Sequence, residues 1–229
     1  DHMTRALGIE RRIESRITEK KSLLGNVETE RQLKIQTDTD APDIILSLEN
    51  ITVRFGERTV LDNVSLRVRK GDRIAVVGPN GCGKTTLLRA AFGELPVESG
   101  TVYLPSYLTT ARAYQHPLWA TGFLREHLAN AGFDETLFRT MMGCFGVTGT
   151  MFDRPLETFS FGQRKKVDLC RSFLHPAHLL VWDEPMNYID LLSRESIEEA
   201  VRECAPTLLF VEHDRTFVEN VATSVIELG

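Results

Sequence analysis

A glycine-rich loop between an apolar run and a helical pattern is the first feature of this sequence that could do chemistry. The stretch RIAVVGPNGCGKTTLLRA places two glycines five positions apart, directly before a lysine and a threonine. Glycines let consecutive N–H groups point at phosphate oxygens, and the following helix N-terminus adds its dipole. The lysine would bind the β- and γ-phosphates, and the threonine hydroxyl would bind Mg²⁺. The expected phosphate-binding residues are Gly78, Pro79, Asn80, Gly81, Cys82, Gly83, Lys84, Thr85 and Thr86.

Two adjacent acids, Asp183 and Glu184, follow the apolar run at 179–182. A buried strand that ends in two acids places one carboxylate near a metal ion and the next near an attacking water. We therefore assign Asp183 to Mg²⁺ and Glu184 to orienting or deprotonating the water. Such a pair alone is often an ordinary acid at a helix start, but the phosphate loop upstream favours the catalytic interpretation.

A histidine ends the next apolar run, at 207–211, within the sequence Glu212-His213-Asp214. A lone histidine is more often structural than functional. On the strand next to a phosphate loop, however, His213 is placed to contact the γ-phosphate, and we predict this role for it.

The hydrophobic pattern predicts the elements that must position these residues. Short β-rich runs alternate with helical stretches at 85–92, 124–131, 136–144 and 163–174. The later runs are continuously apolar and end in acids, as in buried parallel strands whose C-terminal ends carry the chemistry. The first runs, ILSLENITVRF and VSLRVR, indicate an antiparallel β patch. We predict an α/β domain with a mixed or parallel sheet core, this antiparallel patch and a small helical lobe.

The N-terminal region has a different character. Asp1-His2-Met3 looks like a cloning remnant before a start methionine, and residues 6–27 lack proline. Their apolar side chains fall on one helical stripe, which predicts an amphipathic helix. The stripe contains Ile9, Ile13, Ile17, Leu24 and Val27.

Two interpretations of this helix stay open and are compatible. It is half of a coiled-coil hairpin with a solvated charged face, or its basic edge contacts RNA phosphates. The basic edge contains Arg11, Arg12, Arg16, Lys20 and Lys21. The polar segment 37–42 is expected to join the helix to the main domain.

Composition excludes several classes of protein. The net charge is −5, and because residues 1–37 carry a basic excess, the rest of the chain is more acidic than this total, which argues against general nucleic-acid binding by the main domain. No apolar run approaches the roughly 20 residues of a membrane span, and no secretion signal is present, so we expect a cytoplasmic protein without membrane insertion. The four cysteines form no CxxC pair, which disfavours a zinc site or a disulfide framework.

The stretch ETFSFGQRKK at 157–166 resembles the signature motif of ABC-type ATPases, commonly written LSGGQ. In that family, the start of the following helix binds the γ-phosphate of an ATP held by the opposing domain. The resemblance assigns this role to Ser160, Gly162 and Gln163. The chain departs from the motif at Phe159, which replaces leucine, and at Phe161, which replaces the first glycine. Phe161 would place a bulky side chain beside the neighbour's nucleotide.

Three further roles follow from the resemblance, which covers about 44–229 and implies ATP and Mg²⁺ as ligands. Phe55 matches the aromatic residue that stacks on adenine, with a core phenylalanine as the alternative. Gln115 matches the glutamine that reaches Mg²⁺ and the water. Asp190 matches the aspartate that contacts the other domain's phosphate loop. Met186 and Tyr188 replace the more usual threonine and histidine.

The short segment between Gln115 and Ser160, the basic N-terminal helix and Asn187 after Asp-Glu-Pro resemble the ABC-F proteins. These are soluble chains with two ATPase domains joined by a charged helical hairpin. The stretches FSFGQRKK, VWDEPMNYID and LFVEHDRTF look most like the subgroup that protects ribosomes from antibiotics. The resemblance implies ATP hydrolysis and a linker that contacts the ribosome, its RNA and tRNA.

On this interpretation, residues 1–3 are a cloning scar, 4–38 end the interdomain linker, and 39–229 form the ABC ATPase domain. Hydrolysis by this chain alone should be weak, because each site needs a facing signature motif from a second ATPase domain, in cis or in a head-to-tail homodimer. The alternatives are the ATPase subunit of a membrane transporter and a binding module in which ATP acts as a conformational clamp.

Overall fold

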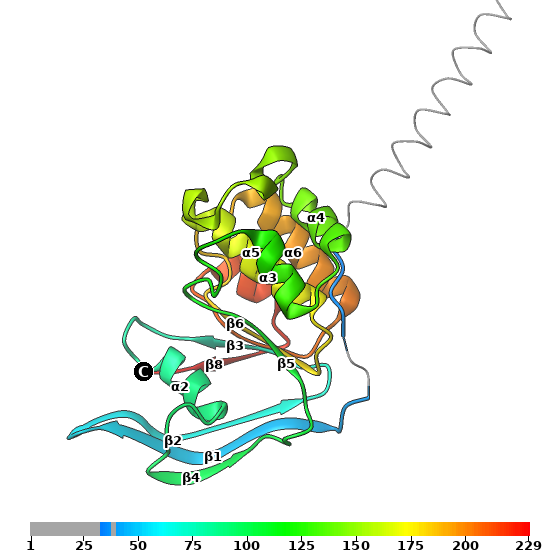
Figure 1. The fold of residues 1–229 in the computed structure, drawn as a ribbon. Helices are drawn as coiled ribbons and strands as arrows, with labels where there is room; N and C mark the ends of the chain where they lie inside the picture. Colours follow the sequence, from blue (N-terminus) through cyan, green and yellow to red (C-terminus); the bar gives the residue numbers. More distant parts are fainter. Residues whose placement is uncertain (1–32, 38–39) are drawn as a thin grey trace, which may run out of the picture. The chain divides into compact units, whose positions relative to one another are not determined.

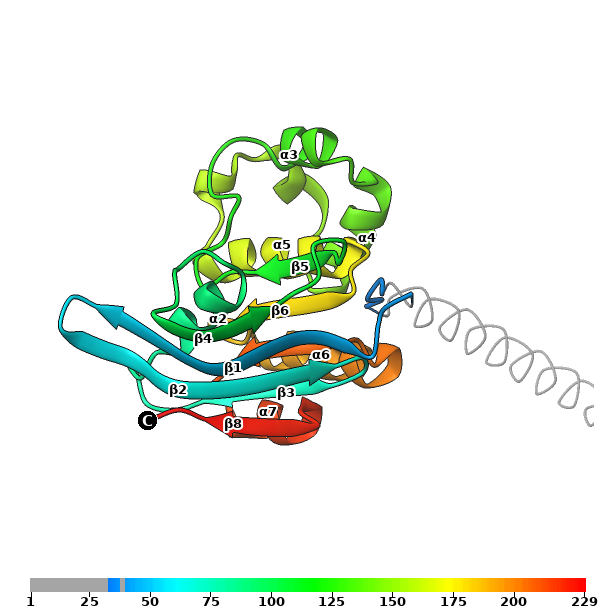
Figure 2. The same ribbon diagram turned by 90° about the horizontal axis from the view of Figure 1, so that it is seen from below.

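Two β-sheets organise residues 33–37 and 40–229, the part of the chain that the computed structural model describes (Figure 1). The antiparallel sheet has the order β2 (Arg58–Arg69), β1 (Ile44–Phe55), β4 (Ser99–Tyr103). The other sheet is parallel and has the order β5 (Thr110–Ala113), β6 (Leu179–Asp183), β7 (Leu208–Val211), β3 (Arg73–Val77), β8 (Ser224–Glu227). Figure 2 shows the long β1–β2 hairpin running beside β4.

The helices divide between the two faces of the parallel sheet. Helix α2 (Lys84–Ala91) packs between this sheet and the antiparallel one. The helices whose side chains join the core on the opposite face are α3 (Leu124–Ala131), α4 (Glu135–Cys144), α5 (Phe161–Leu174), α6 (Leu191–Cys204) and α7 (Arg215–Val221). The connection from α4 to α5 contains two 3₁₀ turns, η1 (Gly149–Asp153) and η2 (Leu156–Thr158).

The period of two along each parallel strand separates two hydrophobic cores. In β6, Leu180 and Trp182 face the core under α5 and α6, whereas Leu179 and Val181 face the core under α2. Strand β7 alternates in the same way. Because both faces of these strands are covered, their sequences are continuously apolar, as expected for parallel strands.

The predicted α/β class with a parallel sheet, an antiparallel patch and a helical lobe is confirmed. The four predicted helical stretches appear as α2, α3, α4 and α5, with no end shifted by more than two residues. Sequence analysis did not predict α6 and α7. Each begins after an aspartate, Asp190 or Asp214, whose carboxylate accepts a hydrogen bond from the backbone three residues on, which is a start signal that could have been used.

Residues 33–37 belong to the same structural unit as the two sheets. Leu33 and Ile35 are buried in the core under α5, and the Gln36 amide donates to the Phe173 carbonyl at 2.8 Å. These contacts add residues 33–37 to the domain that the sequence interpretation begins at residue 39. The amphipathic helix and the cloning remnant predicted upstream lie outside the described residues, and the assignment of 4–38 to a linker stays a prediction.

Candidate nucleotide-binding site

The glycine-rich loop connects β3 to α2 with a backbone that only glycine adopts readily. Gly78, Gly81 and Gly83 have φ values of 150°, 79° and 106°. A Cβ atom on Gly78 would lie 2.3 Å from the Leu228 carbonyl oxygen. The loop therefore delivers the free N–H groups of the first turn of α2 to one point, as an anion-binding site requires.

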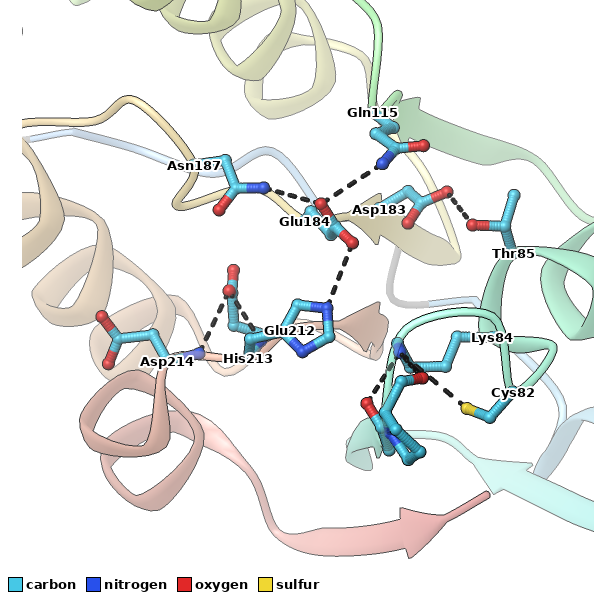
Figure 3. A network of polar contacts seen from close by, with 12 residues as sticks. Cys82, Lys84, Thr85, Gln115, Asp183, Glu184, Asn187, Glu212, His213 and Asp214 are labelled. Atoms are coloured by element: carbon cyan, nitrogen blue, oxygen red, sulfur yellow. Dashed lines mark hydrogen bonds and ion pairs between the residues drawn. The ribbon is translucent and has the colours of Figure 1, made fainter. Parts of the chain in front are cut away.

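Lys84 is the buried cation of this loop and is 6% exposed. Its ammonium donates to the carbonyls of Gly78 and Pro79 at 2.7 and 2.8 Å, and the Cys82 sulfur lies 3.9 Å away (Figure 3). Within the described part of the chain, Lys84 forms no ion pair with a carboxylate. A buried ammonium bonded only to neutral acceptors is well suited to an anionic ligand.

Thr85 and Asp183 form a pair of oxygen donors beside the loop. The Thr85 hydroxyl donates to Asp183 Oδ2 at 3.1 Å, while Oδ1 is buried without a partner. Burial raises the pKa of Asp183, although the Thr85 hydrogen bond partly opposes this. Both residues line a cavity of about 230 Å³ together with Gln115. A buried carboxylate oxygen without a partner is a suitable ligand for a hard cation. Mg²⁺ fits here because it prefers oxygen ligands and needs only one or two protein carboxylates.

The Glu184 carboxylate collects hydrogen bonds from three elements. Gln115 Nε2 donates to Oε2 at 3.3 Å, and Asn187 Nδ2 donates to the same atom at 2.6 Å. His213 Nε2 lies 3.2 Å from Oε1. Figure 3 shows these side chains converging on Glu184 from the segment after β7, the β6–α6 connection and the segment after β5. Donors on both oxygens fix the orientation of the carboxylate, as a general base requires.

One cavity of about 610 Å³ joins the phosphate loop to this carboxylate. Its walls include Lys84, Thr85, Glu184 and His213, and Phe55 lies at its edge. Phe55 is 49% exposed, so the alternative of a core phenylalanine is wrong. The cavity therefore combines the Lys84 ammonium, the Thr85 hydroxyl as a possible metal ligand and the Glu184 carboxylate as a possible partner of a water. The aromatic ring of Phe55 lies at its edge.

Comparison with known proteins identifies the family. Residues 61–187, more than half of the chain, match the model of the family described as ABC transporter. The chain belongs to the ABC transporter family. A structure titled ATP binding subunit of ABC transporter shares the fold, with a TM-score of 0.66 and 24% identity over 80% of this chain and 85% of that chain.

Relatives of the ABC domain include members of the F branch. The ATP-binding protein Uup of Caulobacter vibrioides is 34% identical over 80% of this chain and 32% of that protein. The ribosome protection protein VmlR of Bacillus subtilis is 33% identical over 96% of this chain and 41% of that protein. ABC transporter F family member 2 of Arabidopsis thaliana is 30% identical over 80% of this chain and 28% of that protein. The chain thus spans less than half the length of these relatives.

Four predicted residues of the ABC domain lie outside its own nucleotide cavity. Ser160 and Gln163 form a reciprocal capping box at the start of α5. A Cβ on Gly162 would lie 2.6 Å from the Tyr188 carbonyl oxygen, so no side chain fits there without a shift. Asp190 caps α6 and forms an ion pair with Lys166 at 2.6 Å. None of the four lines the cavity that contains Lys84.

Phe161, the departure from the signature motif, packs within its own ABC domain. The centroid of its ring lies 4.9 Å from that of the Tyr188 ring, in an edge-on arrangement, and 6.3 Å from that of the His116 ring. Tyr188 is 74% exposed and has a φ of 64°. The two unusual aromatic residues of this sequence, at the signature and after Asp-Glu-Pro, therefore contact each other.

Sequence reasoning missed several residues of the site. Arg58 and Val60 line the cavity, and Asn187, which was noted only for its resemblance, holds Glu184. Lys165 and Glu212 are buried beneath the site. The Glu212 carboxylate accepts hydrogen bonds from the backbone amides of Met186, His213 and Asp214. These bonds join the segment after β6 to the segment after β7. The sequence signal for Lys165 and Glu212 was a charged residue among apolar residues that are expected to be buried.

Proposed function

We propose that this chain binds ATP with Mg²⁺ and hydrolyses it as one ATPase domain of an ABC-F protein that acts on the ribosome. The observation that carries the nucleotide part is the single cavity lined by both Lys84 and Glu184. This cavity combines a phosphate-binding loop with a carboxylate held by three neighbouring side chains. The family match supports ATP as the nucleotide.

The loop side of the cavity would hold the triphosphate. Phosphate oxygens would offer Lys84 anionic acceptors in place of the two loop carbonyls. The Thr85 hydroxyl, the orphaned oxygen of Asp183 and the Gln115 amide oxygen would hold Mg²⁺, which neutralises charge on the phosphates when bound. Phe55 would stack on the base.

Glu184 would orient the attacking water and accept its proton. The water oxygen bonds to the γ-phosphorus while the bond to the bridging oxygen breaks and ADP leaves. The hydrogen bonds from Gln115 and Asn187 keep the carboxylate oriented for this transfer. His213, on the other carboxylate oxygen, would contact the γ-phosphate.

A second ATPase domain would complete the site. Ser160, Gly162 and Gln163 begin a helix away from the chain's own cavity, which supports a role toward the nucleotide of a facing domain. Asp190 would contact the facing phosphate loop. A single chain would therefore hydrolyse ATP slowly unless two copies pair head to tail.

The ribosome part of the proposal rests on the relatives. VmlR, named a ribosome protection protein, is similar over 96% of the chain, including the basic N-terminal region. We propose that this region reaches ribosomal RNA and tRNA and that the protein works in the cytoplasm. The structural neighbour is titled as a transporter subunit, but its 24% identity reflects the fold alone. None of the helices in the described part of the chain has both the length and the hydropathy of a membrane span.

The variant Glu184→Gln tests the enzymatic part. We expect phosphate release to slow by about 100-fold or more while ATP binding is retained, because the amide cannot accept the proton of the water. Binding is measured with a fluorescent ATP analogue and turnover with a phosphate sensor. Lys84→Ala is the matched control and should lose binding itself. Equal turnover of wild type and Glu184→Gln would contradict the assignment.

The same variant in the full-length protein tests the ribosome part. Trapped in the ATP-bound form, it should sediment with ribosomes through a sucrose cushion and inhibit translation in an extract. The double variant Lys84→Ala, Glu184→Gln should stay in the supernatant. Absence of Glu184→Gln protein from the ribosome pellet in saturating ATP would overturn the ribosome assignment while leaving the ATPase assignment intact.

A further inference from the structure

Lys165, in the second turn of α5, is a buried lysine that the proposed reaction has not used. It is 1% exposed, and lysines are seldom buried so deeply without a partner. Its ammonium donates to two backbone carbonyls, those of Tyr114 at 3.1 Å and Glu184 at 3.0 Å. Burial lowers the pKa of Lys165, and the surrounding carboxylates, with Asp168 the strongest, oppose this effect.

The two carbonyls belong to the two segments that place the water-binding groups. The Tyr114 carbonyl is part of the peptide bond to Gln115, so its hydrogen bond fixes the start of the Gln115 backbone. Asp168, one turn along α5 from Lys165, accepts a hydrogen bond from the Tyr114 amide at 2.7 Å. It also accepts one from the Leu118 amide at 3.4 Å. The backbone is therefore bonded to α5 at Tyr114, before Gln115, and at Leu118, after it.

Glu184 needs a similar restraint, since its φ of 51° is unfavourable for any residue other than glycine. Its amide donates to the Val211 carbonyl at 2.9 Å, and its carbonyl accepts from Lys165. The backbone of Glu184 is thus held from β7 on one side and from α5 on the other. Such strained residues persist only where their surroundings determine the conformation.

We propose that Lys165 is a positioning residue that sets Gln115 and Glu184 relative to each other for attack by water. Through it, the helix that begins with the signature residues holds both groups of the hydrolytic site. A shift at the start of α5, where a facing nucleotide would bind, would then reach Glu184 through the Lys165 ammonium and reach the Gln115 segment through Lys165 and Asp168. This inference rests on the proposed ATPase function.

The variant Lys165→Met tests the proposal, because methionine has an unbranched side chain of similar length and lacks the donor. We expect single-turnover hydrolysis to slow by about 10- to 100-fold, since small displacements of reacting groups have effects of this size. The dissociation constant for the fluorescent ATP analogue should change less than about twofold, because Lys165 does not line the cavity that contains the phosphate loop. Lys165→Leu, which also lacks a donor, serves if the methionine variant does not fold.

A matched control is Ser172→Ala on the same helix. Ser172 is fully buried and accepts a hydrogen bond from Trp182 Nε1 at 3.1 Å, away from the cavity. This variant should lower the melting temperature and leave the rate constant unchanged. The proposal is overturned if the Lys165 variants hydrolyse ATP at the wild-type rate, or if Ser172→Ala shows an equal loss of rate. Failure of the wild type itself to bind or hydrolyse ATP would instead overturn the proposed function.

Discussion

Gly78 illustrates how a single backbone position determines whether the phosphate loop can form. Its φ is 150°, which residues with a side chain rarely adopt. A Cβ atom at this position would also lie 2.3 Å from the carbonyl oxygen of Leu228, so there is no space for a side chain. Gly93, after α2, also has a positive φ, of 70°, but a Cβ there meets nothing within 4 Å. The two glycines therefore separate the cost of backbone strain from the cost of a steric overlap.

We expect Gly93→Ala to lower the free energy of unfolding by about 1–2 kcal/mol, the cost of a left-handed conformation for an L-residue. Gly78→Ala should lower it by about 1–3 kcal/mol more, because the Cβ overlaps backbone that must move, and it should also weaken ATP binding. Urea unfolding and nucleotide titration measure the two effects. An equal loss of stability in both variants would show that the overlap at Gly78 is relieved freely.

At the scale of helices and strands, the residues directly before α5 and α6 each serve two purposes. Ser160 and Asp190 cap their helices and are also the residues predicted to face a second domain. Burial by itself would raise the pKa of Asp190, but hydrogen bonds from Lys166 and Ser193 outweigh it and lower the pKa to about 2. The ion pair of Lys166 with Asp190 ties the two helix starts together.

The variant Asp190→Asn keeps the capping oxygen and removes the charge. A carboxylate with a lowered pKa in the folded state stabilises the fold above its unfolded pKa, and this contribution is lost as the pH falls through its folded pKa. We expect the variant to be less stable than wild type at pH 7 by up to about 1 kcal/mol, since the side chain is half exposed. The difference should shrink between about pH 4 and pH 2. A difference that stays constant across this range in urea unfolding would exclude the charge as its source.

At the scale of the whole molecule, the chain has one complete set of motifs but not one complete site. The signature residues do not line the cavity with Lys84 and Glu184, and on the proposed function a second, facing domain would bring the two halves together. The chain covers 28% to 41% of the three relatives compared above, which leaves room in those proteins for a second domain.

Mixing two inactive variants tests the arrangement of two half-sites. Lys84→Ala removes phosphate binding, whereas Ser160→Asp keeps a good helix cap and places a negative charge against the facing phosphate. Each variant alone should be inactive. An equimolar mixture should recover hydrolysis, because one of its two composite sites then contains an intact phosphate loop and an intact signature. No recovery, at concentrations where wild-type turnover per chain rises with concentration, would contradict a head-to-tail pair.

The local features of this protein can be predicted from its amino-acid sequence alone. The phosphate loop, the strand ends with Asp183 and His213, and the signature helix are contiguous patterns, and short-range backbone preferences suffice to place them. The α/β class followed for the same reason, because apolar runs and helical periods are local. Helices α6 and α7 were not predicted, although an aspartate cap, which is a local start signal, precedes each of them.

Which side chains contact one another becomes clear only in the folded protein. Gln115 and His213 reach Glu184 from segments far apart in the chain, whereas Asn187 lies three residues after it. Lys165, on α5, contacts the segments of both Gln115 and Glu184. The exposure of Phe55 was likewise open in the sequence. Such contacts depend on how strands pair and helices pack over the whole sheet, which no local pattern encodes, whereas the chemistry of each residue is present in its type alone.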